Sequence, residues 1–317
     1  MISIIVNFFN NRREARNTLH SMTVAYQQGA EAIDYEVIAL DNGSREPLDP
    51  AEVRAFGPRF QHRFFDTISK SPAAAINAAA RDAAGDEFLV LVDGAHILTP
   101  GVLQGARRAF DTFESPFVAT APFHLGPKIQ NESVQQGYDQ SVEDGVLERS
   151  GWKANGYRLY LASRSFADKG NGWFGWPPES GCVGLRKSDF LALGGFDERF
   201  QAPGGGLVNL DFFERAVSEP RLQYVMLLGE GTFHQFHGGV ASNAPLANHP
   251  YPKLHEEYVR LRGKSFAPPT RRPYFIGQIP DEALPAVAAS AARGFAFWQK
   301  ECPPLPDLFA ANPQRSE

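Results

Sequence analysis

Two acidic residues follow directly after apolar runs in the first hundred residues of the chain. Asp41 comes after residues 35–40, and Asp93 comes after residues 88–92. A carboxylate at the end of a strand can accept hydrogen bonds from a ribose or a nucleobase, and it can hold a divalent cation that bridges a diphosphate. The alternatives are an ordinary Asn-Gly turn after Asp41 and a capped loop after Asp93. We expect both carboxylates to mark a ligand site, with His96 as a further candidate metal ligand.

Two more histidines, His234 and His237, lie in the segment GEGTFHQFHGG after an apolar run. Imidazole nitrogen is a good ligand for ions such as Mn²⁺ and Zn²⁺. Residues three apart on an extended segment face opposite sides, so we expect only one of the two to point at the site. A structural, hydrogen-bonded role is the alternative for each. The HExxH helix of zinc hydrolases is missing, so that class is not indicated.

Two carboxylates in the second half could act on a hydroxyl acceptor. Asp211, in the segment PGGGLVNLDFFERA, is a candidate general base or positioning group, and a helix N-cap is the alternative. Glu179 is the second candidate and follows the aromatic segment WFGW. Trp173 and Trp176 of that segment could stack on a sugar ring, with core packing as the alternative.

The elements that must position these residues alternate between strand and helix. The patterns predict strands at 2–8, 35–40, 88–92 and 117–123, and helices at 13–27, 72–84 and 100–113. Such alternation is typical of a parallel sheet with helices on its faces, and ligands bind at the carboxyl ends of its strands.

We divide the chain into a domain over residues 1–244 and an extension over residues 245–317. The domain has a donor-nucleotide half, 1–124, and an acceptor half, 125–244. The extension holds 12 of the 24 prolines, so we expect it to be irregular and packed on the core.

Composition excludes several classes of protein. The 31 basic and 36 acidic residues give a net charge of −5, which does not favour nucleic acid or an anionic membrane as a partner. Cys182 and Cys302 form no CxxC pair, so neither a disulfide framework nor a cysteine zinc site is indicated, and a cytoplasmic location is expected. No apolar run approaches the ~18 residues of a membrane span.

In combination and order, four segments resemble the family 2 glycosyltransferases of the GT-A fold, over about residues 1–240. They are ISIIVNFFN, YEVIALDNGS, SPAAAINAAARDAAGDEFLVLVD and GCVGLRKSDFLALGGFDERF. The resemblance implies an α/β fold with a Rossmann-like mixed sheet flanked by helices, followed here by the proline-rich extension.

The resemblance also implies roles for residues on the donor side. Asp41 would contact the nucleoside with Phe8 and Phe9 nearby, and Asn77 would flank the diphosphate. Asp93 matches the first acid of the family's DxD motif, whose third position is Ala95 in this chain. His237 or His234 matches the late histidine that completes the metal site in some GT-A enzymes.

On the acceptor side the family's Glu/Asp-Asp-x-Asp tract corresponds to Val208-Asn209-Leu210-Asp211, which leaves Asp211 as its only carboxylate. The implied activity is transfer of a sugar from a nucleotide-diphosphate sugar to a hydroxyl of a glycan, lipid-linked or small-molecule acceptor. Inversion and assistance by Mn²⁺ or Mg²⁺ are expected.

Two alternatives to this activity are open. The missing acids favour a non-catalytic sugar-nucleotide or glycan-binding protein of the same fold. A dinucleotide-dependent oxidoreductase is disfavoured, because the first strand leads into NFFNNRRE without a glycine-rich loop.

Overall fold

The apolar run at the N-terminus forms an inner strand of a large sheet. The computed structural model describes residues 1–165, 172–239 and 241–301. Strand β1 (Ile2–Phe8) is buried along its whole length and pairs in parallel with β2 (Tyr35–Asp41) and β4 (Glu87–Leu91). Strand β3 (Phe60–Phe64) pairs in parallel with β2. A strand covered on both faces carries apolar side chains at nearly every position, which explains the continuous apolar runs.

The rest of the sheet is mixed. Strand β8 (Val183–Arg186) is antiparallel to both β4 and β6 (Pro116–Leu125). Beyond β6 the parallel direction resumes with β9 (Gln223–His234) and β10 (Tyr274–Gly277). The order is β10-β9-β6-β8-β4-β1-β2-β3. Two short antiparallel strands complete it, β5 (His96–Leu98) beside β9 and β7 (Ser163–Ser165) beside β6. The expected mixed α/β sheet is confirmed.

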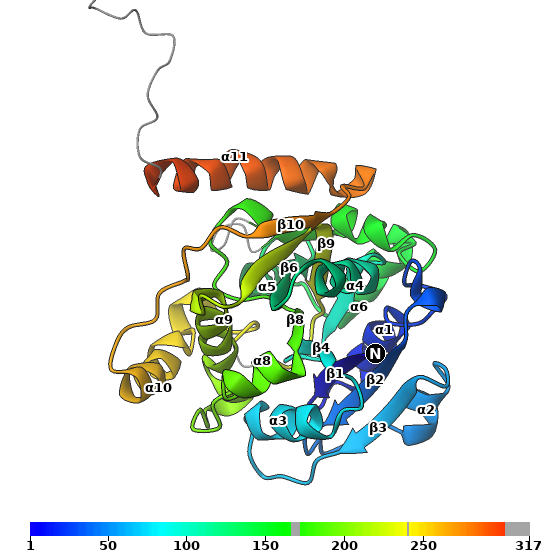
Figure 1. Cartoon of the computed structure of the whole chain (residues 1–317). Helices are drawn as coiled ribbons and strands as arrows, with labels where there is room; N and C mark the ends of the chain where they lie inside the picture. The colour runs from blue at the N-terminus through cyan, green and yellow to red at the C-terminus, as the bar shows by residue number, and fades with distance from the viewer. Residues whose placement is uncertain (166–171, 240, 302–317) are drawn as a thin grey trace, which may run out of the picture.

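Helices lie on both sides of this sheet (Figure 1). Before residue 240 they are α1 (Arg12–His20), α2 (Pro50–Arg54), α3 (Ala73–Asp82), α4 (Val102–Thr112), α5 (Gln130–Gln135), α6 (Gln140–Ser150), α8 (Lys187–Ala192) and α9 (Val208–Ser218). Short 3₁₀ segments are η1 (Ala30–Ala32), η2 (Gly156–Ala162), η3 (Gly172–Phe174), η4 (Pro203–Gly205), η5 (Leu246–Asn248) and η6 (Asp281–Ala283).

The alternation of side chains along β1 separates two buried clusters. Ile5 belongs to the same cluster as Ile76 of α3, whereas Ile4 belongs with Leu19 of α1 and Leu103 of α4. Successive residues of a strand point to opposite faces of the sheet. Helix α3 therefore covers one face, and α1 and α4 cover the other.

Helix α1 ends earlier than its spacing predicts. We expected a helix over 13–27, whereas α1 ends at His20. Ser21 gives the reason, because its Oγ donates to the Thr18 carbonyl at 2.6 Å and accepts from the Leu98 N–H at 3.1 Å. These bonds tie the chain to β5, and it continues to residue 27 as turns.

The C-terminal extension is more regular than its proline content predicts. It contains α10 (Tyr251–Arg262), the strand β10 and α11 (Leu284–Glu301), which lies beyond β10 in Figure 1. Pro252 and Pro285 fall in the first turns of these helices, where no intrahelical N–H is required. Residues 302–317 lie outside the described residues, and the proposed domain boundaries stay a prediction. Among the helices described, none combines the length and apolarity needed to cross a membrane.

Candidate functional site

Asp93 lies in the loop at the carboxyl end of β4. Asn7 of β1 holds the start of this loop, since its Nδ2 donates to the Val92 carbonyl at 3.0 Å. Oδ1 of Asp93 accepts from the Ala95 N–H at 2.9 Å and from Asn11 Nδ2 at 3.3 Å. One carboxylate oxygen is thus fixed by its own loop and by the residue before α1, and Oδ2 is left for other partners.

Both late histidines point at that second oxygen. Nε2 of His234 and Nε2 of His237 each lie 3.2 Å from Oδ2 of Asp93, and they lie 3.1 Å from each other. The prediction that only one would face the site is wrong. Strand β9 ends at His234, so the residues up to His237 no longer alternate across a strand. Among the residues that the structure describes, Asp93, His234 and His237 form a cluster of side chains that could bind a metal ion.

Hydrogen bonds define which nitrogen of His234 carries the proton. Its Nδ1 lies 2.7 Å from Oε1 of Gln130, and Nε2 of the same glutamine donates to Asn243 at 2.6 Å. An amide oxygen can only accept, so Nδ1 of His234 is the protonated nitrogen. Its Nε2 therefore directs a lone pair at the centre of the cluster, as a metal ligand requires.

The electrostatics of the cluster favour a bound positive charge. Burial alone would raise the pKa of Asp93. The charges and hydrogen bonds of His237 and His234 have a larger, opposite effect and hold this pKa well below its usual range. Burial lowers the pKa of His234, although the negative charge of Asp93 nearby opposes this shift. Burial acts the same way on His237, but the attraction of Asp93 exceeds it and raises the pKa of His237. Asp93 is thus ionised, and His237 is the imidazole that holds a proton most readily.

The spacing of the three ligand atoms fits a transition-metal ion. Ligands about 2.1 Å from such an ion lie about 3.0 Å apart at right angles and about 3.4 Å apart in a tetrahedron. The separations of 3.1 and 3.2 Å fall between these values. Two imidazoles and one carboxylate also match the ligands that Mn²⁺, Fe²⁺ and Zn²⁺ accept, whereas Mg²⁺ prefers oxygen.

His96 lies beside this cluster. Its Nδ1 donates to the carbonyl of Asp93 at 3.0 Å, and its ring centroid is 4.9 Å from that of His234. Burial, and then the neighbouring His234, lower the pKa of His96 to about 4. The side chain is therefore neutral near pH 7, and a role for it as a further ligand stays a prediction.

Asp41 is buried and uses both carboxylate oxygens within its own loop. Oδ1 accepts from the Ser44 N–H at 2.9 Å, and Oδ2 accepts from the Leu48 N–H at 2.8 Å. Because no part of the side chain is exposed, it shapes the loop after β2. Its direct contact with a nucleoside stays a prediction.

The other predicted donor-side residues differ in exposure. Phe8 is fully buried and lies so close to Gly94 that a Cβ there would clash with its ring. Phe9, which is 36% exposed, presents its ring to solvent at the carboxyl end of β1. Asn77 exchanges two hydrogen bonds, of 2.8 and 2.9 Å, with the backbone of Phe196. Of these three residues, only Phe9 is thus accessible to a ligand, while Phe8 and Asn77 support the surrounding loops.

Asp211 lies in a buried ion-pair cluster. It accepts from Arg215 Nε at 2.9 Å and from Arg262 Nε and Nη2 at 2.5 and 2.8 Å. The carboxylate has no exposed surface. Arg215 also donates to the carbonyls of Leu193 and Gly195, so this cluster joins α9 to α10 and to the loop after α8.

Glu179 lies on a segment that passes beside His96. Its Oε2 accepts from Nδ2 of Asn209, in the first turn of α9, at 2.7 Å. Two residues on, Gly181 lies against the His96 ring, since a Cβ at Gly181 would come within 2.9 Å of Cδ2. The segment that carries Glu179 therefore runs beside His96, and its carboxylate is only partly buried.

The aromatic residues before Glu179 differ in burial. Trp173 is fully buried and its Nε1 donates to the Leu227 carbonyl at 2.8 Å, so it packs in the core. Phe174 and Trp176 are partly buried and pack against Trp298 of α11, with ring centroids 5.9 and 6.1 Å apart. Core packing thus accounts for Trp173, and stacking of a sugar ring on Trp176 stays a prediction.

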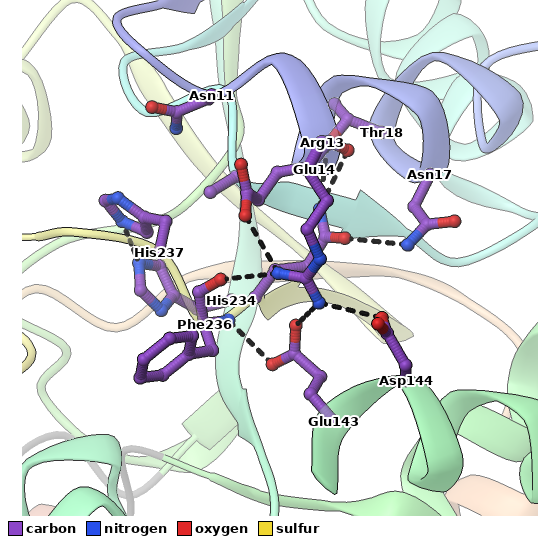
Figure 2. Close-up of polar contacts among 12 residues, drawn as sticks. Asn11, Arg13, Glu14, Asn17, Thr18, Glu143, Asp144, His234, Phe236 and His237 are labelled. Carbon is purple, nitrogen blue, oxygen red and sulfur yellow. Dashed lines mark hydrogen bonds and ion pairs between the residues drawn. The ribbon is translucent and has the colours of Figure 1, made fainter. Parts of the chain in front are cut away.

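Several residues that orient the site were missing from the sequence prediction. Asn11 holds Asp93, and Gln130 orients His234. Arg13 and Glu143 bind the carbonyl and the N–H of Phe236, which precedes His237 (Figure 2). Gln130, Arg13 and Glu143 lie on α5, α1 and α6, far from the histidines in sequence. Nothing in their local pattern distinguishes them from ordinary surface residues.

Comparison with known proteins identifies the family. Residues 3–173 match the sequence model of Glycosyl transferase family 2. The structure is similar to S. aureus TarS 1-349 in complex with UDP, with 14% identity and a TM-score of 0.51, over 94% of this chain and 73% of that one. The same protein in complex with UDP-GlcNAc gives 14% identity and a TM-score of 0.50, over 93% and 73% of the two chains.

A longer S. aureus TarS chain is also similar, with 16% identity and a TM-score of 0.48, over 74% of this chain and 36% of that one. This chain thus spans little more than a third of that protein. No curated protein sequence matches. Because the family match covers more than half of the 317 residues, the chain belongs to glycosyl transferase family 2, and the predicted family, GT-A fold and glycosyltransferase class are confirmed.

Proposed function

We propose that this chain transfers a sugar from a nucleotide-diphosphate sugar to a hydroxyl acceptor, with inversion at the anomeric carbon. The observation that carries the proposal is the convergence of Asp93, His234 and His237 on one point at the carboxyl ends of β4 and β9. The UDP and UDP-GlcNAc complexes of TarS support a nucleotide sugar as the donor.

Asp93, His234 and His237 would hold a divalent cation, with Mn²⁺ preferred over Mg²⁺ because two of the three ligands are imidazoles. His96 is the candidate for a further ligand. When bound, the cation would neutralise the charge of the departing diphosphate. Asn11 and Gln130 support this role. Asn11 binds Oδ1 of Asp93 and Gln130 binds Nδ1 of His234, which leaves Oδ2 and Nε2 of these two residues for the cation.

Phe9 would contact the nucleoside directly because its ring is accessible beside the loop after β2. Asp41, Phe8 and Asn77 would act on the donor by shaping the loops around it. Asp41 fixes the loop after β2, and Asn77 fixes the turn at Phe196.

Glu179 is the proposed general base. In the transfer step the acceptor oxygen forms a bond to the anomeric carbon as the bond from that carbon to the phosphate oxygen breaks. The electron pair leaves with the nucleoside diphosphate, and the acceptor proton passes to Glu179. Asn209, at the position where the family usually has an acid, would orient this carboxylate through the 2.7 Å hydrogen bond. Asp211 is the weaker candidate because two arginines occupy its oxygens.

The test measures donor turnover with a panel of UDP-, GDP- and dTDP-sugars, with and without Mn²⁺. The donor is identified first by a thermal shift, since a ligand of the folded state raises its stability. Glu179→Gln should lower transfer by about 10²–10⁴-fold and leave the donor-induced thermal shift unchanged. Glu148→Gln, at an exposed position of α6, is the matched control.

The second candidate is a sugar-nucleotide-binding protein without transferase activity. The absence of acids at Ala95 and Asn209 favours it. Donor binding without hydrolysis or transfer, for every acceptor and cation tried, would support this candidate and contradict the proposed reaction.

A further inference from the structure

The backbone of Phe236, between the two histidines, is held by one charged side chain at its N–H and by another at its carbonyl. Its N–H donates to Glu143 Oε2 at 2.6 Å, and its carbonyl accepts from Arg13 Nη1 at 2.9 Å. Figure 2 shows Arg13 reaching from α1 and Glu143 reaching from α6 to this residue. Side chains from two helices far apart in sequence therefore bind the two successive peptide groups that Phe236 joins, between His234 and His237.

Arg13 and Glu143 also bind each other. Arg13 Nη2 lies 3.2 Å from Glu143 Oε1, so the two side chains and the backbone of Phe236 form a closed ring of contacts. Glu143 has no exposed surface, and Tyr138 donates to its Oε2 at 3.1 Å. Arg13 has two further partners, Glu14 at 2.8 Å and Asp144 at 2.8 Å. The Glu143 side of the ring is thus shielded from water, whereas the Arg13 side chain is 24% exposed and that of Asp144 is 57% exposed.

The preceding residue, Gln235, is fixed by the same helix. Its side chain accepts from Asn17 Nδ2 at 3.0 Å and donates to Thr18 Oγ1 at 3.1 Å. Its backbone N–H donates to the carbonyl of Ala95, in the loop that carries Asp93, at 2.8 Å. Helix α1 therefore locates the histidine segment relative to the Asp93 loop.

We infer that Arg13 and Glu143 are positioning residues that hold His234 and His237 on the same side of the chain by clamping the backbone N–H and carbonyl of Phe236. In a continued strand these histidines would face opposite sides. The departure from the strand leaves the Phe236 N–H and carbonyl without strand partners, and buried backbone groups must be paired. Without the clamp the two peptide groups joined at Phe236 would turn to find other partners, and His237 would move with them.

This inference rests on the proposed cation site, and Mn²⁺ alone is the probe. Binding is measured from the EPR signal of free Mn²⁺ with the full chain. Arg13→Gln and Glu143→Ala should each weaken Mn²⁺ binding by about 10–100-fold, the usual effect of losing a group that orients ligands. Arg13→Lys should bind with an intermediate affinity, because lysine keeps the charge but loses the fork of two donors.

Asp144→Asn is the matched control, since it removes a partner of Arg13 without touching the peptide. Its Mn²⁺ affinity should equal that of the unmodified protein. If Arg13→Gln and Glu143→Ala lower the melting temperature and leave Mn²⁺ affinity unchanged, the pair is merely structural and the inference is wrong.

A second measurement separates the clamp from the cation site. In the metal-free protein, ¹⁵N NMR of the imidazoles reports the hydrogen bonds among His234, His237 and Asp93. The clamp variants should shift both imidazole signals, and Asp144→Asn should shift neither. If the unmodified protein binds no Mn²⁺ but these shifts appear, the cation site fails and the clamp stands. Unchanged imidazole signals in both clamp variants would overturn the clamp.

Discussion

Asp211→Asn distinguishes a structural role of this residue from a catalytic one. The carboxylate is fully buried and receives hydrogen bonds from two arginines whose side chains are 24% and 17% exposed. An amide of the same size cannot neutralise Arg215 and Arg262, and its NH₂ group would face their N–H groups. We therefore expect a loss of stability with little change in the transfer rate of the folded enzyme.

The size of the loss follows from the burial of the cluster. Removing one partner of a buried ion pair costs about 3–5 kcal/mol when the remaining charges stay buried without compensation. Arg262 keeps a second partner, Asp197, at 2.8 Å, so we expect a loss at the lower end, about 3 kcal/mol. With about 2.1 cal/mol/K of unfolding entropy per residue, this corresponds to a melting temperature about 4–5 °C lower for a chain of this length. Differential scanning calorimetry measures the change, and donor turnover at 20 °C measures the activity of the folded protein.

The control is Glu52→Gln on the surface. Glu52 pairs with Arg12 at 3.2 Å, and both side chains are more than 40% exposed. Such pairs contribute at most about 1 kcal/mol, so the melting temperature of Glu52→Gln should fall by no more than about 2 °C. An Asp211→Asn enzyme with an unchanged melting temperature and a turnover reduced by a factor of about 10² or more would refute the structural role and make Asp211 the base.

Two further predictions concern buried ionisable groups. Burial raises the pKa of Glu230 to about 7 from a usual 4.5, so the folded protein keeps a proton that the unfolded chain releases between these values, and stability falls as pH rises through this window. The melting temperature of Glu230→Gln relative to the unmodified protein should therefore increase from pH 5 to pH 8, and a constant difference would contradict the buried acid. Burial also raises the pKa of the Cys182 thiol to about 12, so iodoacetamide at pH 8 should leave its peptide unlabelled until urea unfolds the chain, as followed by mass spectrometry.

The sequence could predict the donor side of the sheet because the signals there are local. An apolar run followed by an acid predicted both the strand β4 and the place of Asp93 at its end. The alanine-rich run after Pro72 predicted α3 to within two residues. Each of these features depends on neighbours in sequence, so the pattern carries the information.

Features that depend on distant contacts could not be predicted in this way. The pairing of His234 with His237 at Asp93 needs Arg13 and Glu143, which lie about 90 to 220 residues away from Phe236. The same reason applies to the two arginines around Asp211, one of which comes from α10. In the extension, the number of prolines led to the prediction of irregular structure. A count ignores the position of each proline, and a proline in the first turn of a helix is compatible with that helix.

The surroundings of Ala95 explain why this position of the DxD motif does not carry an acid in this chain. Ala95 has no exposed surface, and its backbone N–H and carbonyl bind Asp93 and Gln235. A carboxylate added at this point would be buried beside Asp93, where two like charges oppose each other. Ala95→Asp should therefore destabilise the protein by about 3–5 kcal/mol in calorimetry and should not tighten Mn²⁺ binding, whereas Ala51→Asp, at an exposed site, should leave both unchanged. Tighter Mn²⁺ binding by a stable Ala95→Asp protein would contradict this reasoning. It would mean that position 95 faces the cation and that the fold can accept a carboxylate there, so that His237 replaces that carboxylate as a ligand in this chain.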